Sequence, residues 1–412
     1  MYSLAIHLYA LIVALVSPFN KKARMMRLGQ WKTNSILRDK IDRKAKYIWF
    51  HAASLGEFEQ GRPMIEKIRA EHPQYKILLT FFSPSGYEVR KNYKGVDVIC
   101  YLPFDTPIRV LKFVHYVQPV MAIFIKYEFW MNYLTELKRR GIPVYIISAI
   151  FRPQQLFFRW YGKPYRRIFS CYRHIFVQDQ ASRDLLAHYK ITNVSIAGDT
   201  RFDRVIDIRK QAHDIPIVEK FVAVGTDRMH LTLISGSTWP PDEEMLIRYF
   251  NEHPQLRLII APHEIHREHL MYIESLLKRP SVRLSDLLHD DTLVEDKDCL
   301  IVDSFGLLSS IYRYGSLAYV GGGFGAGIHN TLEAAVYGIP VVFGPKFQKF
   351  KEARDLITVG GGFTVDDERS FREKLDELLG DEKMLTQCGE KAGLFVNGNA
   401  GSTDKILKEI EL

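Results

Sequence analysis

The sequence is poor in cysteine and has no paired-cysteine motif. Its four cysteines stand far apart among 412 residues, at positions 100, 171, 299 and 388. This spacing argues against a disulfide framework or a thiolate zinc site and is typical of a protein in a reducing compartment. Hydrophobic residues make up 47% of the chain, which argues against extended disorder. A chain of this length is expected to fold into two or three domains.

The first 20 residues contain no Asp, Glu, Lys or Arg, whereas residues 21–46 carry ten Lys and Arg against two Asp. A cleaved signal peptide has its basic region before the apolar stretch and a small-residue cleavage site after it, and neither is present. About 18 to 20 apolar residues followed by cations predict a membrane anchor at 1–20, with the rest of the chain on the cytoplasmic side. A buried or amphipathic N-terminal helix is the alternative interpretation.

The formal net charge of +8 is concentrated in two segments. The second, residues 151–174, interleaves six Lys and Arg with eight aromatic residues and contains no acid. Such a mixture suits the interface between acyl chains and anionic headgroups. Single-stranded RNA could stack on the same rings, and core aromatics with solvated cations are a third interpretation. We expect membrane lipids as partners and no nucleic acid, because localised charge does not suit wrapping of a duplex.

Short apolar runs alternate with helix-length segments along most of the chain. Strands are predicted at 47–52, 76–82, 97–101, 119–125, 143–149, 174–178, 231–236, 257–262, 299–303, 316–320 and 339–343. Helices are predicted between them, for example at 58–71, 242–252, 266–278 and 330–337. This alternation predicts α/β domains whose parallel sheets are covered by helices on both faces. It pauses at 198–230, which predicts two doubly wound domains at 21–205 and 206–412.

The strongest local signal is a glycine-rich turn, in which five glycines fall within residues 321–327 after a predicted strand. Glycines let backbone N–H groups approach a phosphate at the start of a helix. After the next strand no carboxylate occurs before Glu352, which favours a mononucleotide over a dinucleotide. Glu333 follows Asn330 by three residues, so it either accepts from ribose hydroxyls or completes a capping box.

Two further strand ends in the second half point to the same edge of the sheet. They are residues 261–263 (APH) and 303–306 (DSFG), and ligands of such sheets bind beyond the carboxyl ends of the strands. Asp296 and Asp298 form a DxD sequence, but they precede a strand and belong to the opposite edge. We find no His or Cys cluster with ligand spacing, and we expect neither a metal nor a cofactor.

Three charged residues of the first half stand at predicted strand ends or at the domain junction. Glu57 follows strand 47–52, where it could act as a general base or merely favour a first helical turn. Glu128 follows strand 119–125 and could stabilise an oxocarbenium-like centre. Arg201 lies at the junction and could bind a leaving phosphate. Spacing alone leaves the structural alternative open for each.

Seven short motifs occur in an order that resembles the Kdo transferase family, the 3-deoxy-D-manno-octulosonic acid transferases of glycosyltransferase family 30. They are HAASLGE (51–57), YEFW (127–130), GDTRFD (198–203), GSTWPPDEE (236–244), APH (261–263), DSFG (303–306) and GGGFGAGIHNTLEAA (321–335). The resemblance covers essentially the whole chain. It implies a GT-B fold, with two Rossmann-like domains facing an interdomain cleft after an N-terminal anchor helix.

The resemblance also implies a reaction. Kdo would be transferred from CMP-Kdo, with inversion, to the 6′-hydroxyl of the lipid A precursor at the cytoplasmic face of the inner membrane. This reaction belongs to lipopolysaccharide biosynthesis and would need no metal, no cofactor and no obligate protein partner.

The resemblance assigns roles residue by residue. Glu57 matches the proton acceptor, and Glu128 and Arg201 match the transition-state stabilisers. The CMP-contacting segments match Pro262, His263, Phe305, Gly306, Leu307, Asn330, Thr331, Leu332 and Glu333. Two positions depart from the family pattern. Lys is usual where Arg201 stands; Arg keeps the positive charge but changes the reach of the side chain and presents a forked guanidinium. Glu is usual where Leu307 stands, so that only backbone donors are expected there.

Two rival functions are distinguishable by experiment. A GT-B transferase or epimerase acting on a UDP-sugar would be protected against heat by UDP and not by CMP. A non-catalytic nucleotide-binding membrane adaptor would be unaffected in cells by Glu57→Gln.

Overall fold

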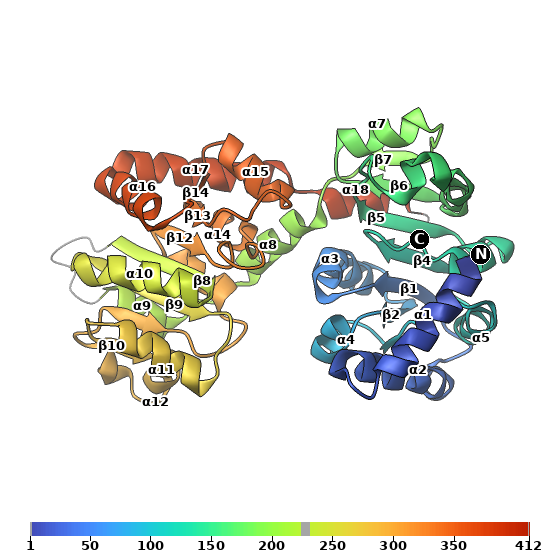
Figure 1. Cartoon of the computed structure of the whole chain (residues 1–412), viewed down its shortest axis with the longest axis horizontal. Coiled ribbons are helices and arrows are strands. Elements are labelled where there is room, and N and C mark those ends of the chain that lie inside the picture. The colour runs from blue at the N-terminus through green and yellow to red at the C-terminus, as the bar shows by residue number, and fades with distance from the viewer. Residues whose placement is uncertain (1, 224–230, 411) are drawn as a thin grey trace. The chain divides into compact units, whose positions relative to one another are not determined.

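The computed structural model describes residues 2–223, 231–410 and 412. The chain divides into two compact units, Met1–Arg204 with Ala400–Leu412 and Val205–Asn399 (Figure 1). The unit boundary falls one residue before the expected one. The last segment differs more, because residues 400–412, expected in the second domain, pack with the first unit, where Ile406 is buried against the sheet.

The first unit contains one parallel sheet. Its strands are β1 (Lys46–Ala52), β2 (Tyr75–Phe81), β3 (Val98–Tyr101), β4 (Met121–Ile125), β5 (Val144–Ala149), β6 (His174–Val177) and β7 (Val194–Ile196). Its helices are α1 (Tyr2–Val16), α2 (Lys21–Lys40), α3 (Leu55–Glu71), α4 (Pro84–Arg90), α5 (Pro107–Val117), α6 (Met131–Arg139), η1 (Leu156–Phe158), η2 (Trp160–Cys171), α7 (Gln180–His188) and α18 (Ser402–Glu409). Helix α8 (Thr200–Gln211) starts in this unit and ends in the next.

The strand order of the first sheet is β3-β2-β1-β4-β5-β6-β7. Both faces of β1 are buried: Trp49 contributes to a cluster with α5 and α6, whereas Phe50 contributes to a cluster with α3 and α18. Near-continuous apolar strands are the consequence of this two-sided burial. Because β1 and β4 are neighbours, the segments that follow them meet at one edge of the sheet.

The second unit also contains one parallel sheet. Its strands are β8 (Leu231–Thr238), β9 (Leu256–Pro262), β10 (Ser281–Arg283), β11 (Cys299–Ile301), β12 (Leu317–Val320), β13 (Val341–Phe343) and β14 (Gly362–Thr364). Its helices are α9 (Pro216–Ala223), α10 (Pro240–Glu252), α11 (Arg267–Leu276), α12 (Leu284–His289), η3 (Asp291–Val294), α13 (Leu308–Ile311), η4 (Tyr312–Tyr314), α14 (Leu332–Ala335), α15 (Lys351–Thr358), α16 (Glu368–Gly380) and α17 (Glu382–Gly398).

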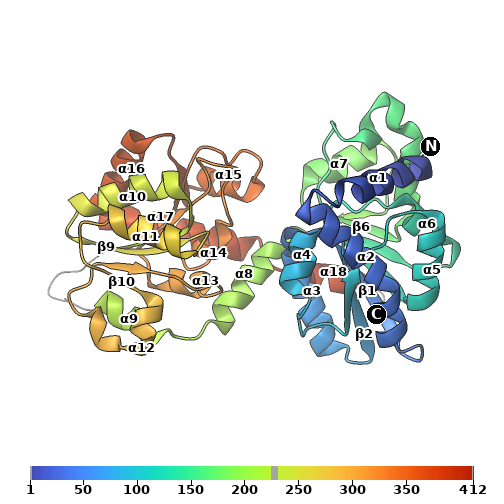
Figure 2. The same cartoon turned by 60° about the horizontal axis from the view of Figure 1, so that its bottom comes forward.

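The strand order of the second sheet is β10-β11-β9-β8-β12-β13-β14. Helices α10, α11 and α16 lie over one face and α9 and α12 over the other (Figure 2). Since β9, β8 and β12 are adjacent and parallel, the loops that follow them share one edge. The prediction of two parallel, doubly wound α/β sheets is confirmed.

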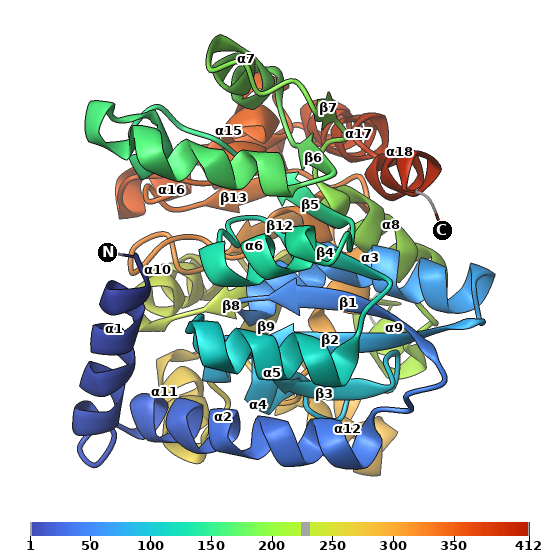
Figure 3. The ribbon, with the colours of Figure 1, turned by 90° about the vertical axis from the view of Figure 1, so that its right-hand side faces the viewer.

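Helices α1 and α2 lie on the first unit and meet at a bend of 118° (Figure 3). One face of α1 is fixed to the unit: the Tyr2 hydroxyl donates to Asp105 at 2.6 Å, and Val13 packs with Met26 and Phe104. Among the described residues no single helix is long and apolar enough to cross a membrane, whereas this bent pair passes the same test by length and composition.

Candidate functional site

The carboxyl edge of the first sheet carries Glu57. Ser54 directly precedes α3, and Glu57 lies in the first turn of that helix. The Ser54 hydroxyl donates to Glu57 Oε2 at 2.6 Å, and the Glu57 side chain is half-buried. A carboxylate in this position is stabilised by the positive end of the helix. Glu57 therefore combines access to solvent with a fixed orientation.

Glu128, after the neighbouring strand β4, is buried and held by donors. Its side chain is 5% exposed, and its Oε2 lies 2.5 Å from Trp130 Nε1 and 2.9 Å from His51 Nε2. The other ring nitrogen of His51 lies 2.8 Å from the hydroxyl of Thr80 on β2. The Tyr172 hydroxyl fixes the main chain by donating to the Glu128 carbonyl at 2.7 Å. Four segments thus determine the direction of this carboxylate.

Arg201 is paired with a buried acid of its own motif. Its Nε and Nη2 donate to Oδ2 of Asp199 at 2.9 and 2.6 Å, and Gln60 Nε2 donates to Oδ1 at 3.3 Å. Burial acts to raise the pKa of Asp199, but the charge and hydrogen bonds of Arg201 outweigh it and lower that pKa. The ion pair therefore holds Arg201 at the edge that carries Glu57.

Tyr127 lies within the field of the charged groups of this edge. Burial raises the pKa of its hydroxyl, Arg152 and Arg201 act to lower it, and Glu57 acts to raise it. Tyr127 and Arg152, with Gln154 and Gln155, line a cavity of about 440 Å³. Glu57 and Arg201 thus belong to one electrostatic neighbourhood, next to an opening large enough for part of a ligand.

The sequence alone predicted no role for several residues of this site. His51 and Asp199 stand inside the motifs that contain Glu57 and Arg201. The partner of His51 is Glu128, 77 residues further along the chain, and the partner of Asp199 is Arg201, two residues further. A buried polar residue at the end of an apolar strand, as His51 is, was the available signal.

In the second unit, the glycine-rich turn packs closely against two neighbouring loops. A Cβ on Gly321 would lie 2.4 Å from the carbonyl oxygen of Ser237, and one on Gly323 would lie 2.5 Å from Gly344. Gly322 has φ +91°, which favours glycine. Glycine is therefore required here by packing as well as by any approach of a phosphate.

Three rings stack beside this turn, at the ends of β8 and β9. The centroid of His263 is 4.6 Å from that of Trp239 and 4.5 Å from that of His329, and both pairs lie within 30° of parallel. Trp239 Nε1 donates to Nε2 of His329 at 3.2 Å. Burial, with His263 nearby, lowers the pKa of His329 to about 4. The ring of His329 is therefore neutral at physiological pH, and the stack offers flat faces at this edge.

The segment after the turn differs from the expected helix at 330–337, because α14 starts only at Leu332. Asn330 donates through Nδ2 to Glu333 Oε1 at 2.9 Å and accepts from the backbone N–H of Leu332 at 3.2 Å. Thr331 and Leu332 are fully buried. Within residues 330–333, only Asn330 and Glu333 are partly exposed.

The remaining expected contacts fall on the same edge. His263 is exposed directly after the buried Pro262, and Phe305 has 75% of its surface exposed. Gly306 has φ +90°, and Leu307 precedes α13. The structure thus brings the predicted nucleotide residues to the strand ends of one sheet.

The acids of two further motifs have structural partners. Asp303 accepts from the backbone N–H and hydroxyl of Ser285, at the start of α12. Asp298 lies before β11 and pairs with Arg279 at 3.2 Å. A cluster of Glu264, His266 and His269 was not recognised in the sequence, although its ligand-type atoms lie within 4.8 Å of one another.

The basic and aromatic segment 151–174 divides into two parts. Phe151, Phe158, Phe169 and Tyr172 are buried in the core of the first unit. Trp160, in contrast, is 88% exposed. Phe157 and Tyr165 are partly buried against the same core, so core packing accounts for six of the eight aromatic residues. The interface interpretation applies only to the exposed Trp160 and Tyr161.

Comparison with known proteins agrees with this architecture. The structure is similar to UDP-GlcNAc 2-epimerase from Neisseria meningitidis, with a TM-score of 0.59 and 13% identity over 88% of this chain and 98% of that chain. A putative UDP-N-acetylglucosamine 2-epimerase from Listeria monocytogenes gives a TM-score of 0.57 at 12% identity, covering 88% and 95%. With its two Rossmann-like sheets, the chain has the GT-B type of fold.

Comparison of the amino-acid sequence with known families and proteins gives matches to transferases. Residues 23–204 match the family model of 3-deoxy-D-manno-octulosonic-acid transferase (kdotransferase). The transferase of that name from Aquifex aeolicus is 28% identical, over 82% of this chain and 87% of its own length. The Haemophilus influenzae transferase is 26% identical, over 87% and 85%. The chain is thus similar to Kdo transferases over most of its length, and residues 23–204 carry the domain that the family model describes.

Proposed function

We propose that the protein transfers Kdo from CMP-Kdo to the 6′-hydroxyl of the lipid A precursor, with inversion, in lipopolysaccharide biosynthesis. The observation that carries this proposal is Glu57, a half-buried carboxylate oriented by Ser54 at the ligand-binding edge of the unit that matches the family. A general base must be ionised and within hydrogen-bond reach of the hydroxyl it deprotonates. Glu57 lies in the first turn of α3, where the positive end of the helix favours a negatively charged side chain.

In the proposed step the acceptor oxygen attacks the anomeric carbon of Kdo while the bond from that carbon to the CMP phosphate breaks. The hydroxyl proton passes to Glu57, and the bonding electrons leave with CMP. A single displacement inverts the anomeric carbon. Glu128, fixed by His51 and Trp130, supplies negative charge for the oxocarbenium-like centre, and Arg201 offsets charge on the departing phosphate. No metal takes part in this step.

The second unit is proposed to bind the donor. Trp239, His263 and His329 provide a stacked platform for the cytosine ring or the sugar. Asn330 orients Glu333, whose carboxylate can accept from the ribose hydroxyls. Backbone donors of the glycine-rich turn would contact the phosphate.

We also propose that the protein is bound to the cytoplasmic face of the inner membrane through α1 and α2. The face of α1 that does not pack on the unit exposes apolar side chains, namely Leu4, Leu8, Leu11, Ile12 and Leu15, and Phe19 follows with 92% exposure. On α2, Lys21, Lys22 and Arg24 are exposed beside them. Apolar insertion combined with attraction to anionic lipid gives stable attachment.

The decisive experiment incubates the pure protein with CMP-Kdo and the tetraacylated lipid acceptor and weighs the products by mass spectrometry. A mass gain of one or more Kdo units establishes the reaction and the number of units. Absence of a gain with fully folded protein would contradict the proposal.

A UDP-sugar reaction is the second candidate, favoured by the fold likeness to the Neisseria epimerase. Thermal stabilisation by CMP without stabilisation by UDP supports the Kdo reaction, and the reverse result supports the epimerase-like one.

The membrane attachment is tested by separating membrane-bound from free protein on anionic and zwitterionic vesicles. Leu8→Asp is the variant expected to disrupt the attachment.

A further inference from the structure

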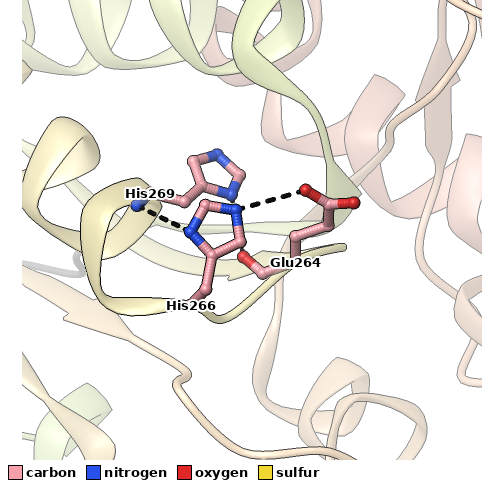
Figure 4. Close-up of side chains that lie close together, drawn as sticks. All are labelled: Glu264, His266 and His269. Carbon is pink, nitrogen blue, oxygen red and sulfur yellow. Dashed lines mark hydrogen bonds and ion pairs between the residues drawn. The ribbon is translucent and has the colours of Figure 1, made fainter.

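Three side chains with metal-ligand chemistry converge between β9 and α11 (Figure 4). Glu264, His266 and His269 each offer one ligand atom within 4.8 Å of the other two. Nε2 of His266 lies 3.3 Å from Oε2 of Glu264. Ligand atoms of a tetrahedral zinc site, with bonds of about 2.0 to 2.1 Å, are separated by about 3.3 Å. This pair is already spaced as two neighbouring ligands of one ion.

Each histidine is held from behind through its second ring nitrogen. Nε2 of His269 lies 2.8 Å from Oε2 of Glu243, which is fully buried and accepts from the Thr238 hydroxyl at 2.9 Å through its other oxygen. Nδ1 of His269 is therefore the atom that faces Glu264, whose main-chain carbonyl it contacts at 2.8 Å. Nδ1 of His266 accepts from the backbone N–H of His269 at 3.2 Å, and it also lies 3.3 Å from Glu268. This bond fixes the His266 ring with Nε2 towards Glu264. Histidines that bind metals typically have their second ring nitrogen held by a hydrogen bond, most often as a donor to a carboxylate, as His269 is placed to donate to Glu243.

The surroundings favour a cation. The cluster opens into a pocket of about 400 Å³ that Trp239 and Tyr272 also line. The Tyr272 hydroxyl donates to Glu244 at 2.5 Å, and this hydrogen bond, with burial and the charge of Glu243, raises the pKa of Tyr272 to about 12. Several carboxylates thus concentrate negative charge at a site with space for a further ligand.

We propose that Glu264, His266 and His269 bind one divalent transition-metal ion of the zinc class. Two imidazoles and a carboxylate select zinc-like ions over magnesium and calcium, which prefer oxygen ligands. The ion replaces the contact between His269 Nδ1 and the Glu264 carbonyl, and it fixes the loop that connects β9 with α11. That loop begins with His263 of the ring stack, so the ion organises the neighbouring nucleotide edge without taking part in transfer. The proposal concerns binding and does not depend on the reaction proposed above.

The test measures zinc binding to the metal-free full-length chain by calorimetry, with magnesium as the comparison ion. Saturable binding of one zinc ion per chain is expected. His266→Ala and Glu264→Gln, both at exposed side chains, are expected to weaken binding about tenfold or more. His289→Ala is the matched control, because His289 is an exposed histidine of the same unit whose Nδ1 lies 2.7 Å from the Ser285 carbonyl of its own helix.

Cobalt substitution supplies an independent spectroscopic measurement. Bound Co²⁺ should give visible absorption typical of nitrogen and oxygen ligands in the unsubstituted chain and in the His289 variant, and this absorption should disappear in the His266 variant. Melting curves without metal should coincide for the unsubstituted chain, Glu264→Gln and His289→Ala, whereas His266→Ala should melt slightly lower because it removes the N-cap acceptor of α11. Equal zinc affinity in the unsubstituted, Glu264 and His266 chains, or equal binding of magnesium and zinc, would overturn the proposal.

Discussion

The two ligand-binding edges of this protein are built by opposite means. In the first unit, charged side chains are fixed by buried partners, as Glu128 is by His51 and Trp130. In the second unit, a close-packed glycine turn and three stacked rings form the edge. The difference follows from the tasks proposed for them. A group that receives a proton or stabilises charge needs a fixed direction, whereas a flat base and a phosphate need ring faces and backbone donors.

Both edges nevertheless share one backbone feature. Lys126, directly before Tyr127 and Glu128, has φ +71°, and Ser237, two residues before Trp239, has φ +53°. Left-handed backbone at such residues costs about 1 to 3 kcal/mol and persists where the surrounding structure enforces it. In each unit this local strain stands where a strand ends and the candidate site begins.

The comparison predicts that changes in the first unit reduce the rate and changes in the second reduce donor affinity. The largest effect is expected for Glu57→Gln, which removes the base and keeps the shape. The turnover number should fall about 100-fold or more, with little change in the KM for CMP-Kdo. Steady-state kinetics measure both constants. Glu71→Gln, at the exposed end of the same helix, is the control; an equal loss in both variants would contradict the assignment.

A smaller loss of turnover is expected for Glu128→Gln than for Glu57→Gln. The substitution removes the negative charge that His51 and Trp130 orient, and the turnover number should fall about 10- to 100-fold. Trp130→Phe removes one donor to the carboxylate while preserving an aromatic side chain, so its effect should be smaller. If Trp130→Phe were more harmful than Glu128→Gln at equal thermal stability, the role given to Glu128 would be wrong.

In the second unit, Trp239→Ala removes one ring of the stack. Stacking on an aromatic side chain contributes about 1 to 3 kcal/mol per base, so CMP should bind about tenfold more weakly. Calorimetric titration with CMP measures this change. The turnover number at saturating donor should remain nearly constant, and a fall in turnover with unchanged CMP affinity would break the division between the two edges.

The smallest effect concerns pH. Because the pKa of His329 is lowered from 6.5 to about 4, protonation favours the unfolded chain. The stability due to the neutral ring is present above pH 6.5 and is lost as the pH falls towards 4. We expect this contribution to the free energy of unfolding to be about 1 to 2 kcal/mol. It is less than the full pKa shift implies, because the His329 ring is partly exposed to solvent. Urea unfolding at pH 7 and pH 4.5 should show a smaller pH difference for His329→Gln than for the unsubstituted chain.

Eleven strands were predicted from the sequence and all eleven occur, with bounds within a few residues. Strands buried on both faces are long apolar runs, which makes them visible in a sequence. The three that were missed, β7, β10 and β14, are three-residue strands, and each lies at an edge of its sheet. A strand that pairs on one side only and buries few side chains leaves a weak pattern.

The segment 151–174 shows the limit of composition. Phe169 and Trp160 stand nine residues apart in the same aromatic run, yet Phe169 is buried and Trp160 is exposed. Which ring enters the core depends on the packing of η2 against the sheet and not on the kind of residue. The tail 400–412 shows the same limit, because only the folded chain places α18 beside α3.

By itself, the sequence determined the alternation of strands and helices, the unit boundary near residue 205 and the strand ends that carry Glu57, Glu128 and His263. These features depend on local order along the chain. Only the tertiary structure decided that His51 orients Glu128, that Trp239, His263 and His329 stack, and that Glu264, His266 and His269 point at one another. Such contacts depend on strand adjacency and on side-chain direction, which hydrophobic periodicity does not encode.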